Sequence, residues 1–285
     1  MCDQDHFEED LKTFEAQGLV TRKQFGVMLG AGIAMMLPKV ANAAAVSDGD
    51  VTITTPDGEC DAYFVHPASG TAPGVLMWPD IFGLRPAFRQ MAKRLAESGY
   101  SVLVVNPFYR TKKAPTADNG GTTPLQQVMP LAQTLNEKTH MTDAKAFTAW
   151  LDKQPSVAKN RKMGTQGYCM GGPMAFRTAV ASDRVGAVAT FHGAALVTKA
   201  ENSPHLQASK TKAQFLICIA TNDDQRSPTD KDVMKDTFAK ANLQAEIEVY
   251  KGAHGWCPPD TQVYNEAEAE RAWSRLLALY GKALA

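Results

Sequence analysis

Short apolar runs alternate with amphipathic stretches from about residue 50 to the end of the chain. Continuous apolar runs are typical of strands that are buried on both faces, and apolar residues that recur every three or four positions predict helices. The expected strands are 74–78, 101–106, 162–166, 185–191, 213–220 and 246–250. The expected helices are 85–98, 125–154 with an interruption near Pro130, 173–180, 231–241 and 264–283.

Two β-rich runs precede this alternating pattern. Residues 51–54 and 62–65 are separated by the turn sequence Pro-Asp-Gly at 56–58, which predicts an antiparallel hairpin. The strands and helices that follow alternate, so we expect a mostly parallel sheet with helices on both faces. The sequence has no internal repeat and no break in composition after residue 45. One α/β domain over 46–285 is therefore the simplest organisation.

Residues 1–45 have the composition of a leader. The basic pair Arg22-Lys23 is followed by the apolar run 26–37 and by an alanine-rich stretch with an A-x-A site at 41–45. This order is typical of a secretory signal, and the basic pair resembles a twin-arginine signal in which Lys23 replaces the second arginine. We expect export, with cleavage near Ala43 or Ala45 and a periplasmic or exported mature protein. A membrane anchor or a buried helix is the alternative, with a cytoplasmic protein if the leader is not a signal.

Composition narrows the classes of partner. The 285 residues carry a formal net charge of +0, whereas a nucleic-acid partner would require a basic face. No long apolar span follows the leader, which predicts a soluble mature protein. The five cysteines show no C-x-x-C spacing, so we expect no metal site and no cofactor.

The stretch 167–172, Gly-Tyr-Cys-Met-Gly-Gly, is the main candidate for chemistry. It lies between an expected strand and an expected helix, and a strand, a G-x-C-x-G turn and a helix form the nucleophile elbow of α/β-hydrolases, with Cys169 in place of serine. So tight a turn requires small neighbours, which accounts for Gly167 and Gly171. The positive end of the helix favours a thiolate, and the N–H group of Met170 can hold an oxyanion. A packed core cysteine is the alternative for Cys169.

Other polar residues follow the expected strands at the same edge of the sheet, where ligands bind in such folds. Asp80 and Ile81 follow the first buried strand, Asp223 and Asp224 follow a later one, and His254 follows the last. The order nucleophile, acid, histidine is that of α/β-hydrolases. We expect His254 to accept the thiol proton and Asp224 to orient its imidazole, with Asp223 as the alternative acid or as a turn cap. We expect the N–H groups of Met170 and Ile81 to form the oxyanion hole.

These motifs, in this order, resemble the dienelactone hydrolase (carboxymethylenebutenolidase) family. The likeness runs from about Val51 to the C-terminus and rests on 79–84, 167–172, Asp224 with Pro228 four residues later, and 254–255. The resemblance implies an α/β-hydrolase fold and a triad of Cys169, Asp224 and His254. It also implies attack on a lactone carbonyl, a thioester acyl-enzyme and hydrolytic release of a keto acid.

The chain departs from the family pattern in two ways. Asp80 stands where the family has a glutamate that lies near the thiol and helps gate its ionisation. The family also holds a substrate carboxylate with arginines, but those positions are Pro258 and Thr111 here. Arg110, one residue before Thr111, is the remaining candidate for an anchor, and a solvated loop arginine is its alternative.

The remaining polar and aromatic candidates are weaker. Trp256 is expected to line the pocket, although core packing is its alternative, and we interpret His192 as structural.

Two other functions remain as alternatives to a lactone or ester hydrolase. A second class of function is a non-catalytic or redox-sensing member of the fold. A third is another thiol acyl-transfer enzyme, such as a class I glutamine amidotransferase; that enzyme has a glutamate two residues after its histidine, where this chain has Trp256.

Overall fold

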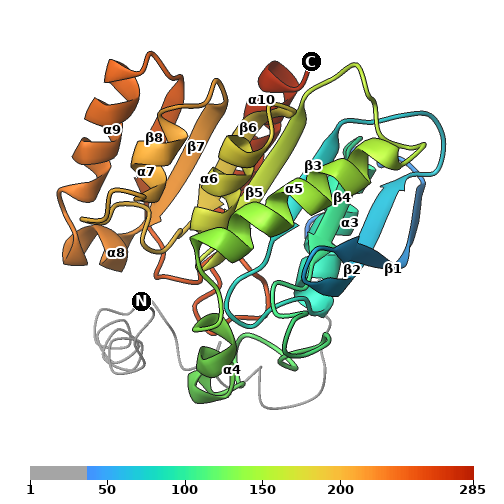
Figure 1. Cartoon of the computed structure of the whole chain (residues 1–285), viewed down its shortest axis with the longest axis horizontal. Coiled ribbons are helices and arrows are strands. Elements are labelled where there is room, and N and C mark those ends of the chain that lie inside the picture. The colour runs from blue at the N-terminus through green and yellow to red at the C-terminus, as the bar shows by residue number, and fades with distance from the viewer. Residues whose placement is uncertain (1–36) are drawn as a thin grey trace.

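An eight-stranded sheet is the centre of the part of the chain that the structure describes, residues 37–285 of a computed structural model (Figure 1). The strand order is β1-β2-β4-β3-β5-β6-β7-β8. β2 runs antiparallel to both of its neighbours, and the remaining neighbouring pairs are parallel. This confirms the expected sheet and its opening hairpin. The strands are β1 (Val46–Thr55), β2 (Gly58–Pro67), β3 (Gly74–Trp78), β4 (Ser101–Val105), β5 (Met163–Tyr168), β6 (Val185–Phe191), β7 (Gln214–Ala220) and β8 (Ala245–Tyr250).

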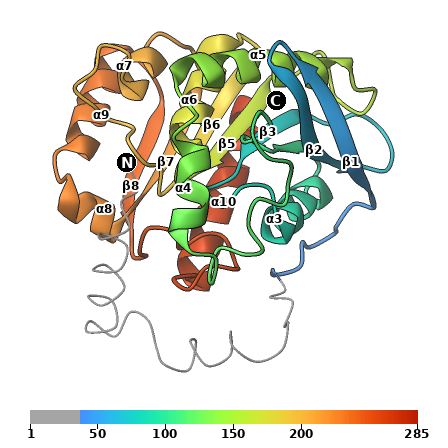
Figure 2. The same cartoon turned by 60° about the horizontal axis from the view of Figure 1, so that its bottom comes forward.

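Helices cover both faces of the sheet (Figures 1 and 2). On one face Phe88 of α3 and Tyr280 of α10 belong to one apolar core. On the other face Phe147 of α5, Phe176 of α6 and Phe238 of α9 belong to a second core. The sheet is therefore buried on both sides, as its continuous apolar strands require. The helices are α3 (Pro86–Glu97), α4 (Leu125–Ala132), α5 (Glu137–Lys153), α6 (Gly171–Ala181), α7 (Pro204–Ala208), α8 (Thr221–Arg226), α9 (Asp230–Lys240) and α10 (Glu266–Ala283).

The central strand β5 is buried although its sequence, MGTQGY, is only partly apolar. α10 lies directly on it: a Cβ atom at Gly164 would lie 2.8 Å from the ring of Tyr280. The hydroxyl of Tyr280 donates to Oε1 of Gln166 at 2.9 Å, and Nε2 of Gln166 donates to the hydroxyl of Tyr168 at 2.8 Å. The buried amide is thus satisfied, as burial of a polar group requires.

The expected helix over 125–154 is two helices, and the break does not fall at Pro130. Pro130 lies inside α4, which continues to Ala132. The break comes after Ala132, and α5 then begins with Asn136 as its N-terminal cap. The Asn136 side chain accepts a hydrogen bond from the backbone N–H of Thr139, and the Thr139 hydroxyl accepts one from the backbone N–H of Asn136. This reciprocal cap starts a new helix, and a cap of this kind stabilises a helix by about 1 kcal/mol.

Two short helices were not expected. α7 lies between β6 and β7, and α8 begins at Thr221, directly after β7. The residues that directly follow β7 therefore point in directions fixed by a helical turn. Successive residues of a helix project on different sides.

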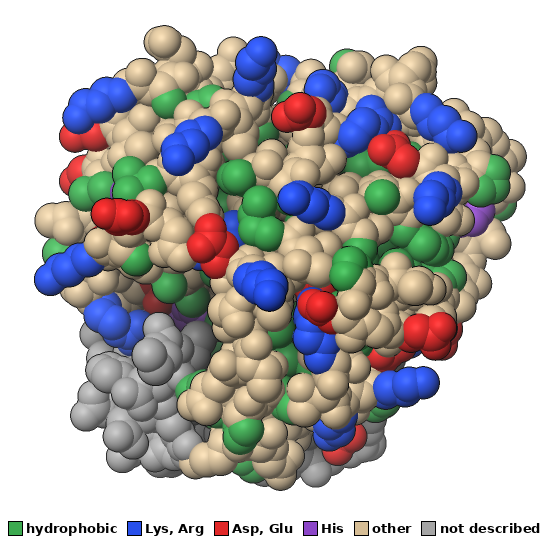
Figure 3. Space-filling view, viewed as in Figure 1, with side chains coloured by type: hydrophobic (Ala, Val, Ile, Leu, Met, Phe, Trp, Pro, Cys, Tyr) green, Lys and Arg blue, Asp and Glu red, His purple; other side chains and the backbone are tan. Residues whose placement is uncertain are grey.

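The predicted leader and export signal lie largely outside the described residues. β1 begins at Val46, next to the predicted cleavage site. Among residues 37–285, none of the helices is both long enough and apolar enough to span a bilayer. On the face drawn in Figure 3, basic and acidic side chains are interspersed, in keeping with the neutral net charge of the sequence.

Candidate active site

Cys169 occupies a strained turn between β5 and α6. Its φ is +50°, in the left-handed region that non-glycine residues seldom adopt. A Cβ atom at Gly167 would lie 2.0 Å from the carbonyl oxygen of Gly171, and one at Gly171 would lie 2.5 Å from that of Trp78. Both glycines are therefore required by close backbone approach. The backbone N–H of Cys169 donates to the carbonyl of Phe191 at 3.2 Å, which fixes the turn against β6.

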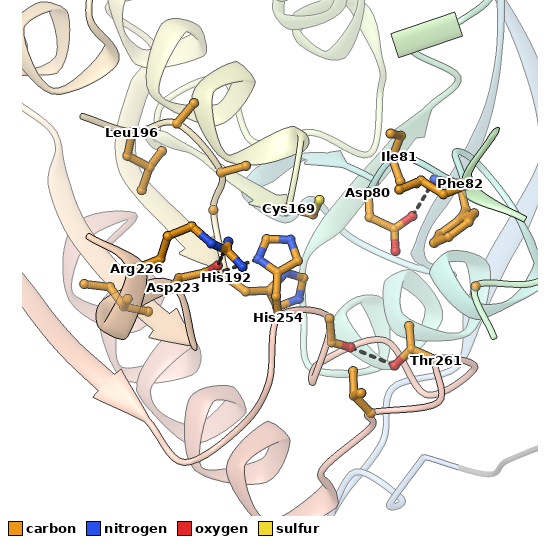
Figure 4. A pocket seen from close by; sticks show the side chains of 18 of the residues that line it. Asp80, Ile81, Phe82, Cys169, His192, Leu196, Asp223, Arg226, His254 and Thr261 are labelled. Carbon is orange, nitrogen blue, oxygen red and sulfur yellow. Dashed lines mark hydrogen bonds and ion pairs between the residues drawn. The ribbon is translucent and has the colours of Figure 1, made fainter. Parts of the chain in front are cut away.

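His254 follows β8 and is held by the residues that follow β7. Its backbone N–H donates to Oδ1 of Asn222 at 2.8 Å. Its Nδ1 lies 2.7 Å from Oδ2 of Asp223, and because an ionised carboxylate only accepts, Nδ1 is the donor. Figure 4 shows His254 and Cys169 facing the same pocket.

The structure corrects the expected acid: Asp223, and not Asp224, is the partner of His254. Oδ1 of Asp224 accepts from Nζ of Lys231 at 2.6 Å instead. The reason is α8, because two consecutive residues at the start of a helix project about a quarter-turn apart and cannot both face His254. The alternative that the sequence left open is the one that the structure adopts.

The two expected oxyanion donors, Met170 and Ile81, come from separate segments at the pocket of Cys169. Met170 follows it at the start of α6, and Ile81 lines the same pocket from the loop after β3. Neither N–H group donates a hydrogen bond to another atom within residues 37–285.

Asp80 lines the pocket, but its carboxylate is already engaged. It accepts from both terminal nitrogens of Arg85, at 2.6 and 2.9 Å, and from the backbone N–H of Phe82 at 2.9 Å. The other edge of the Arg85 guanidinium binds Asp260 at 2.7 and 2.9 Å. Burial opposes the charge on Arg85, yet the two carboxylates outweigh it and raise the pKa of the guanidinium.

The Arg85 cluster joins three segments of the pocket wall. Besides the loop of Asp80 and the loop of Asp260, it contacts the segment of Gly120, whose N–H donates to Oδ2 of Asp260 at 3.0 Å. A Cβ atom at Gly120 would lie 2.8 Å from a terminal nitrogen of Arg85. The long loop over 107–124 thus contributes residues 120–124 to the pocket.

Arg110 does not face the pocket, which corrects its expected role as a carboxylate anchor. Its terminal nitrogens donate to Asp143 at 2.9 and 2.6 Å, and Nε donates to Asp57 at 3.0 Å. The guanidinium also lies over the ring of Tyr109, 4.5 Å from its centroid. Two carboxylates of the chain itself occupy the donors of Arg110, so it fastens the loop to α5 and to the β1–β2 turn.

Trp256 is also placed differently from the expectation. It is fully buried and stacks on Tyr250, with the ring centroids 5.2 Å apart and the planes 6° apart. A Cβ atom at Gly252 would lie 2.6 Å from the indole. Trp256 is thus a core residue beneath the loop of His254, and it does not line the pocket.

His192 is closer to the chemistry than its structural interpretation implied. It directly follows β6 with a φ of +42°, is fully buried and lines the pocket. Its ring meets that of His254 edge-on, with centroids 5.0 Å apart. Neither ring nitrogen has a hydrogen-bond partner within the described chain. Burial, and then the proximity of His254, hold the pKa of His192 well below its ordinary value, so the imidazole is neutral. Its position at a strand end before Gly193 was the available sequence signal.

The pocket that these residues surround has a volume of about 820 Å³. Sequence reasoning missed two of its walls, the segment 194–198 and the face of α9 that carries Asp230, Lys231 and Met234. A search of residues 37–285 for clusters of potential metal ligands finds none. The polar side chains that line the pocket include the Cys169 thiol, two imidazoles, four carboxylates and two cations.

Comparison with known proteins identifies the family. The model of the dienelactone hydrolase family matches residues 60–284. A protein of Methylorubrum extorquens named "Putative carboxymethylenebutenolidase" is 26% identical over 95% of this chain and 96% of its own length. The carboxymethylenebutenolidase of Rhodococcus opacus is 26% identical over 78% of this chain and 86% of its own. The crystal structure named "Putative Dienelactone Hydrolase" from Klebsiella pneumoniae has a TM-score of 0.72 at 22% identity, with 84% of this chain and 99% of that chain covered, and supports the fold. The chain therefore belongs to the dienelactone hydrolase family, and it is a hydrolase of the lactone or carboxylic ester type.

Proposed function

We propose that this protein hydrolyses a small-molecule lactone or carboxylic ester by covalent catalysis, with Cys169 as nucleophile, His254 as general base and acid, and Asp223 as the residue that orients the imidazole. One observation carries the proposal: the 2.7 Å contact between Asp223 and His254 lies at the same pocket as a cysteine held in a strained elbow. A buried structural cysteine requires neither the strain nor the histidine–carboxylate pair.

The proposed reaction has two halves. His254 takes the thiol proton, and the sulfur of Cys169 attacks the scissile carbonyl carbon. The tetrahedral intermediate then collapses, and the bond to the alcohol oxygen breaks as His254 returns the proton to that oxygen. In the second half His254 takes a proton from water, and the resulting hydroxide attacks the thioester carbonyl carbon. The carbon–sulfur bond then breaks, His254 returns the proton to the sulfur of Cys169, and the carboxylic acid leaves.

Asp223 supports both halves through His254. Its hydrogen bond to Nδ1 selects the tautomer in which Nε2 is the basic nitrogen, and its charge stabilises the imidazolium. The hydrogen bond between the backbone of His254 and Asn222 fixes the loop that carries the imidazole. The base is thus oriented by side chain and backbone contacts with the same helix, α8.

The N–H groups of Met170 and Ile81 are the proposed oxyanion donors. One follows the nucleophile, and the other comes from the loop after β3, which is the arrangement of the α/β-hydrolase oxyanion hole. The loop of Ile81 is fixed by its neighbours, because Asp80 is bound by Arg85 and the Gly83 N–H donates to the Asp80 carbonyl at 2.9 Å. Preorganised donors of this kind stabilise the transition state without reorganisation.

An activated ester such as p-nitrophenyl acetate tests the proposal. We expect a burst of nitrophenol in wild type that is lost in Cys169→Ala and after treatment with iodoacetamide. Peptide mapping of the treated protein by mass spectrometry provides the control, because it locates each alkylated cysteine and separates Cys169 from Cys2. Burial raises the pKa of Cys60, Cys218 and Cys257 and leaves them poorly reactive. We therefore expect alkylation at Cys169.

The result also distinguishes the enzyme from a non-catalytic or redox-sensing member of the fold. A sensor would be alkylated at Cys169 but would show no turnover of any ester above the Cys169→Ala background. If that variant kept more than about a tenth of wild-type activity, Cys169 would not be the nucleophile.

A further inference from the structure

The pocket carries an excess of negative charge. Carboxylates outnumber cationic side chains four to two among the residues that line it. Burial holds the pKa of His192 well below its ordinary value, so this histidine is neutral and adds no positive charge to the pocket. The lining carboxylates are Asp80, Asp223, Asp224 and Asp230, and the lining cations are Arg226 and Lys231.

The cations of the pocket already bind carboxylates of the chain. Nζ of Lys231 lies 2.6 Å from Asp224 and 3.1 Å from the carbonyl oxygen of Pro228. A terminal nitrogen of Arg226 lies 3.5 Å from Asp223. A substrate carboxylate would have to displace one of these partners and would then approach the carboxylate that it displaced.

Two further arginines near the pocket, Arg85 and Arg110, are also bound by carboxylates of the chain. Arg85 lies behind Asp80, and both edges of its guanidinium are bound by Asp80 and Asp260. Arg110 lies outside the pocket and binds Asp57 and Asp143. Among the described residues of the pocket wall, an anionic substrate therefore finds no cation that lacks a carboxylate partner.

Apolar side chains form much of the remaining wall. They come from α4, from the segment after β6, from the end of β7, from α9 and from the loop after His254. A pocket of about 820 Å³ with such walls is larger than a five-membered lactone requires and suits an apolar substituent. The main apolar contributors are Leu125, Leu196, Val197, Ile219, Met234 and Val263.

We propose that the substrate of this site is a neutral ester or lactone with an apolar substituent, and that the site discriminates against a carboxylate-bearing substrate. The inference rests on the proposed function, because it names the substrate class of that reaction. The inference follows from the excess of carboxylates over cations in the pocket and from its apolar lining, and not from the identity of the nucleophile.

Three activated esters of similar length test it: p-nitrophenyl hexanoate, methyl p-nitrophenyl adipate and the p-nitrophenyl monoester of adipic acid. The last two differ by one methyl group, which removes the charge. We expect kcat/KM for the methyl diester to exceed that for the monoanion about 10- to 100-fold at pH 7.5 and low salt, since like charges a few ångströms apart repel by this order. The Cys169→Ala variant gives the background for each ester.

The variant Asp224→Asn tests whether the charge of the pocket causes this preference. Removal of this carboxylate lowers the negative charge and releases Lys231, so we expect the preference for the diester to fall about tenfold. Asp232→Asn is the matched control, because Asp232 lies on the exposed side of α9 with its side chain 65% accessible. It should leave the preference unchanged.

Equal or faster hydrolysis of the monoanion would overturn the inference and leave the proposed hydrolysis intact. A preference for the diester that both Asp224→Asn and Asp232→Asn reduce equally would also overturn it, because the cause would then be general surface charge. If none of the three esters is turned over above the Cys169→Ala background, the proposed function fails and the inference fails with it.

Discussion

Oδ2 of Asp223 lies 2.7 Å from Nδ1 of His254, whereas Oδ1 of Asp224, the next residue, lies 2.6 Å from Nζ of Lys231. Two adjacent carboxylates thus have different partners because α8 separates their directions. The relationship assigns orientation of the imidazole to Asp223 and places Asp224 on the wall of the substrate pocket.

The first prediction concerns these two aspartates. Asp223→Asn should lower kcat/KM for an activated neutral ester about 10²- to 10⁴-fold, because the amide no longer favours the productive tautomer or stabilises the imidazolium. Asp224→Asn should change the same value by less than about tenfold, since Asp224 does not contact His254. Steady-state kinetics on both variants check this, and the reverse ranking would make Asp224 the acid.

The second prediction concerns the buried cluster around Arg85. Arg85→Met should lower the free energy of unfolding by about 3–5 kcal/mol, because it leaves the charge of Asp80 buried without its cationic partner. The double variant Asp80→Asn, Arg85→Met should recover part of this loss, since it removes the buried charge as well. Urea unfolding of the two single variants and the double variant forms the cycle, and additive losses would show that the pair does not interact.

The third prediction concerns two glycines. Gly167→Ala should abolish activity and impair folding, because its Cβ atom would lie 2.0 Å from the carbonyl oxygen of Gly171. Gly281→Ala is the control: it lies in α10, and its Cβ atom would meet nothing within 4 Å. It should raise the free energy of unfolding by about 0.5–1 kcal/mol through helix propensity, without loss of activity. An active, normally folded Gly167→Ala enzyme would contradict the geometry of the elbow.

The fourth prediction is a pH dependence of stability. Burial, and then Arg177 and Arg110, lower the pKa of His140 to about 3. The unfolded chain takes up a proton at this residue below about pH 6.5, while the folded protein does not until near pH 3, so the folded state loses stability as the pH falls through this window. The loss should reach about 2 kcal/mol at pH 5.

His140→Gln should remove this contribution. The difference in the free energy of unfolding between pH 7.5 and pH 5 should therefore be smaller in the variant than in wild type by about that amount. Urea unfolding at the two pH values measures it, and comparing differences removes any constant cost of the substitution. An identical difference in both proteins would mean that His140 does not titrate as described.

The fifth prediction concerns localisation. We propose that the protein is exported and cleaved, because the sequence combines the basic pair Arg22-Lys23, an apolar run and an A-x-A site. N-terminal sequencing of protein from the native host should begin near Ala44 or Val46. A soluble cytoplasmic protein that still begins at Met1 would refute the proposal.

The sequence by itself determined the architecture and the position of the elbow. The strands 74–78 and 185–191 agree with β3 and β6 because continuous apolar runs are a local property that burial on both faces demands. The turn at Cys169 was identifiable because Gly167 is required by a backbone contact within the turn itself, with the carbonyl of Gly171. His254 was identifiable because residues after parallel strands collect at one edge of the sheet.

Only the tertiary structure decided which polar groups meet. Arg110 binds Asp57, 53 residues away, and Arg85 binds Asp260, 175 residues away, so neither partner is visible in local spacing. The choice of Asp223 over Asp224 depended on a helical turn of six residues, too short to carry a periodic signal. Trp256 lies in the core because a chain reversal at Gly252 lays it on Tyr250. Periodicity fixes which face of an element is buried, whereas the partner of a side chain depends on elements that are distant in sequence and adjacent in space.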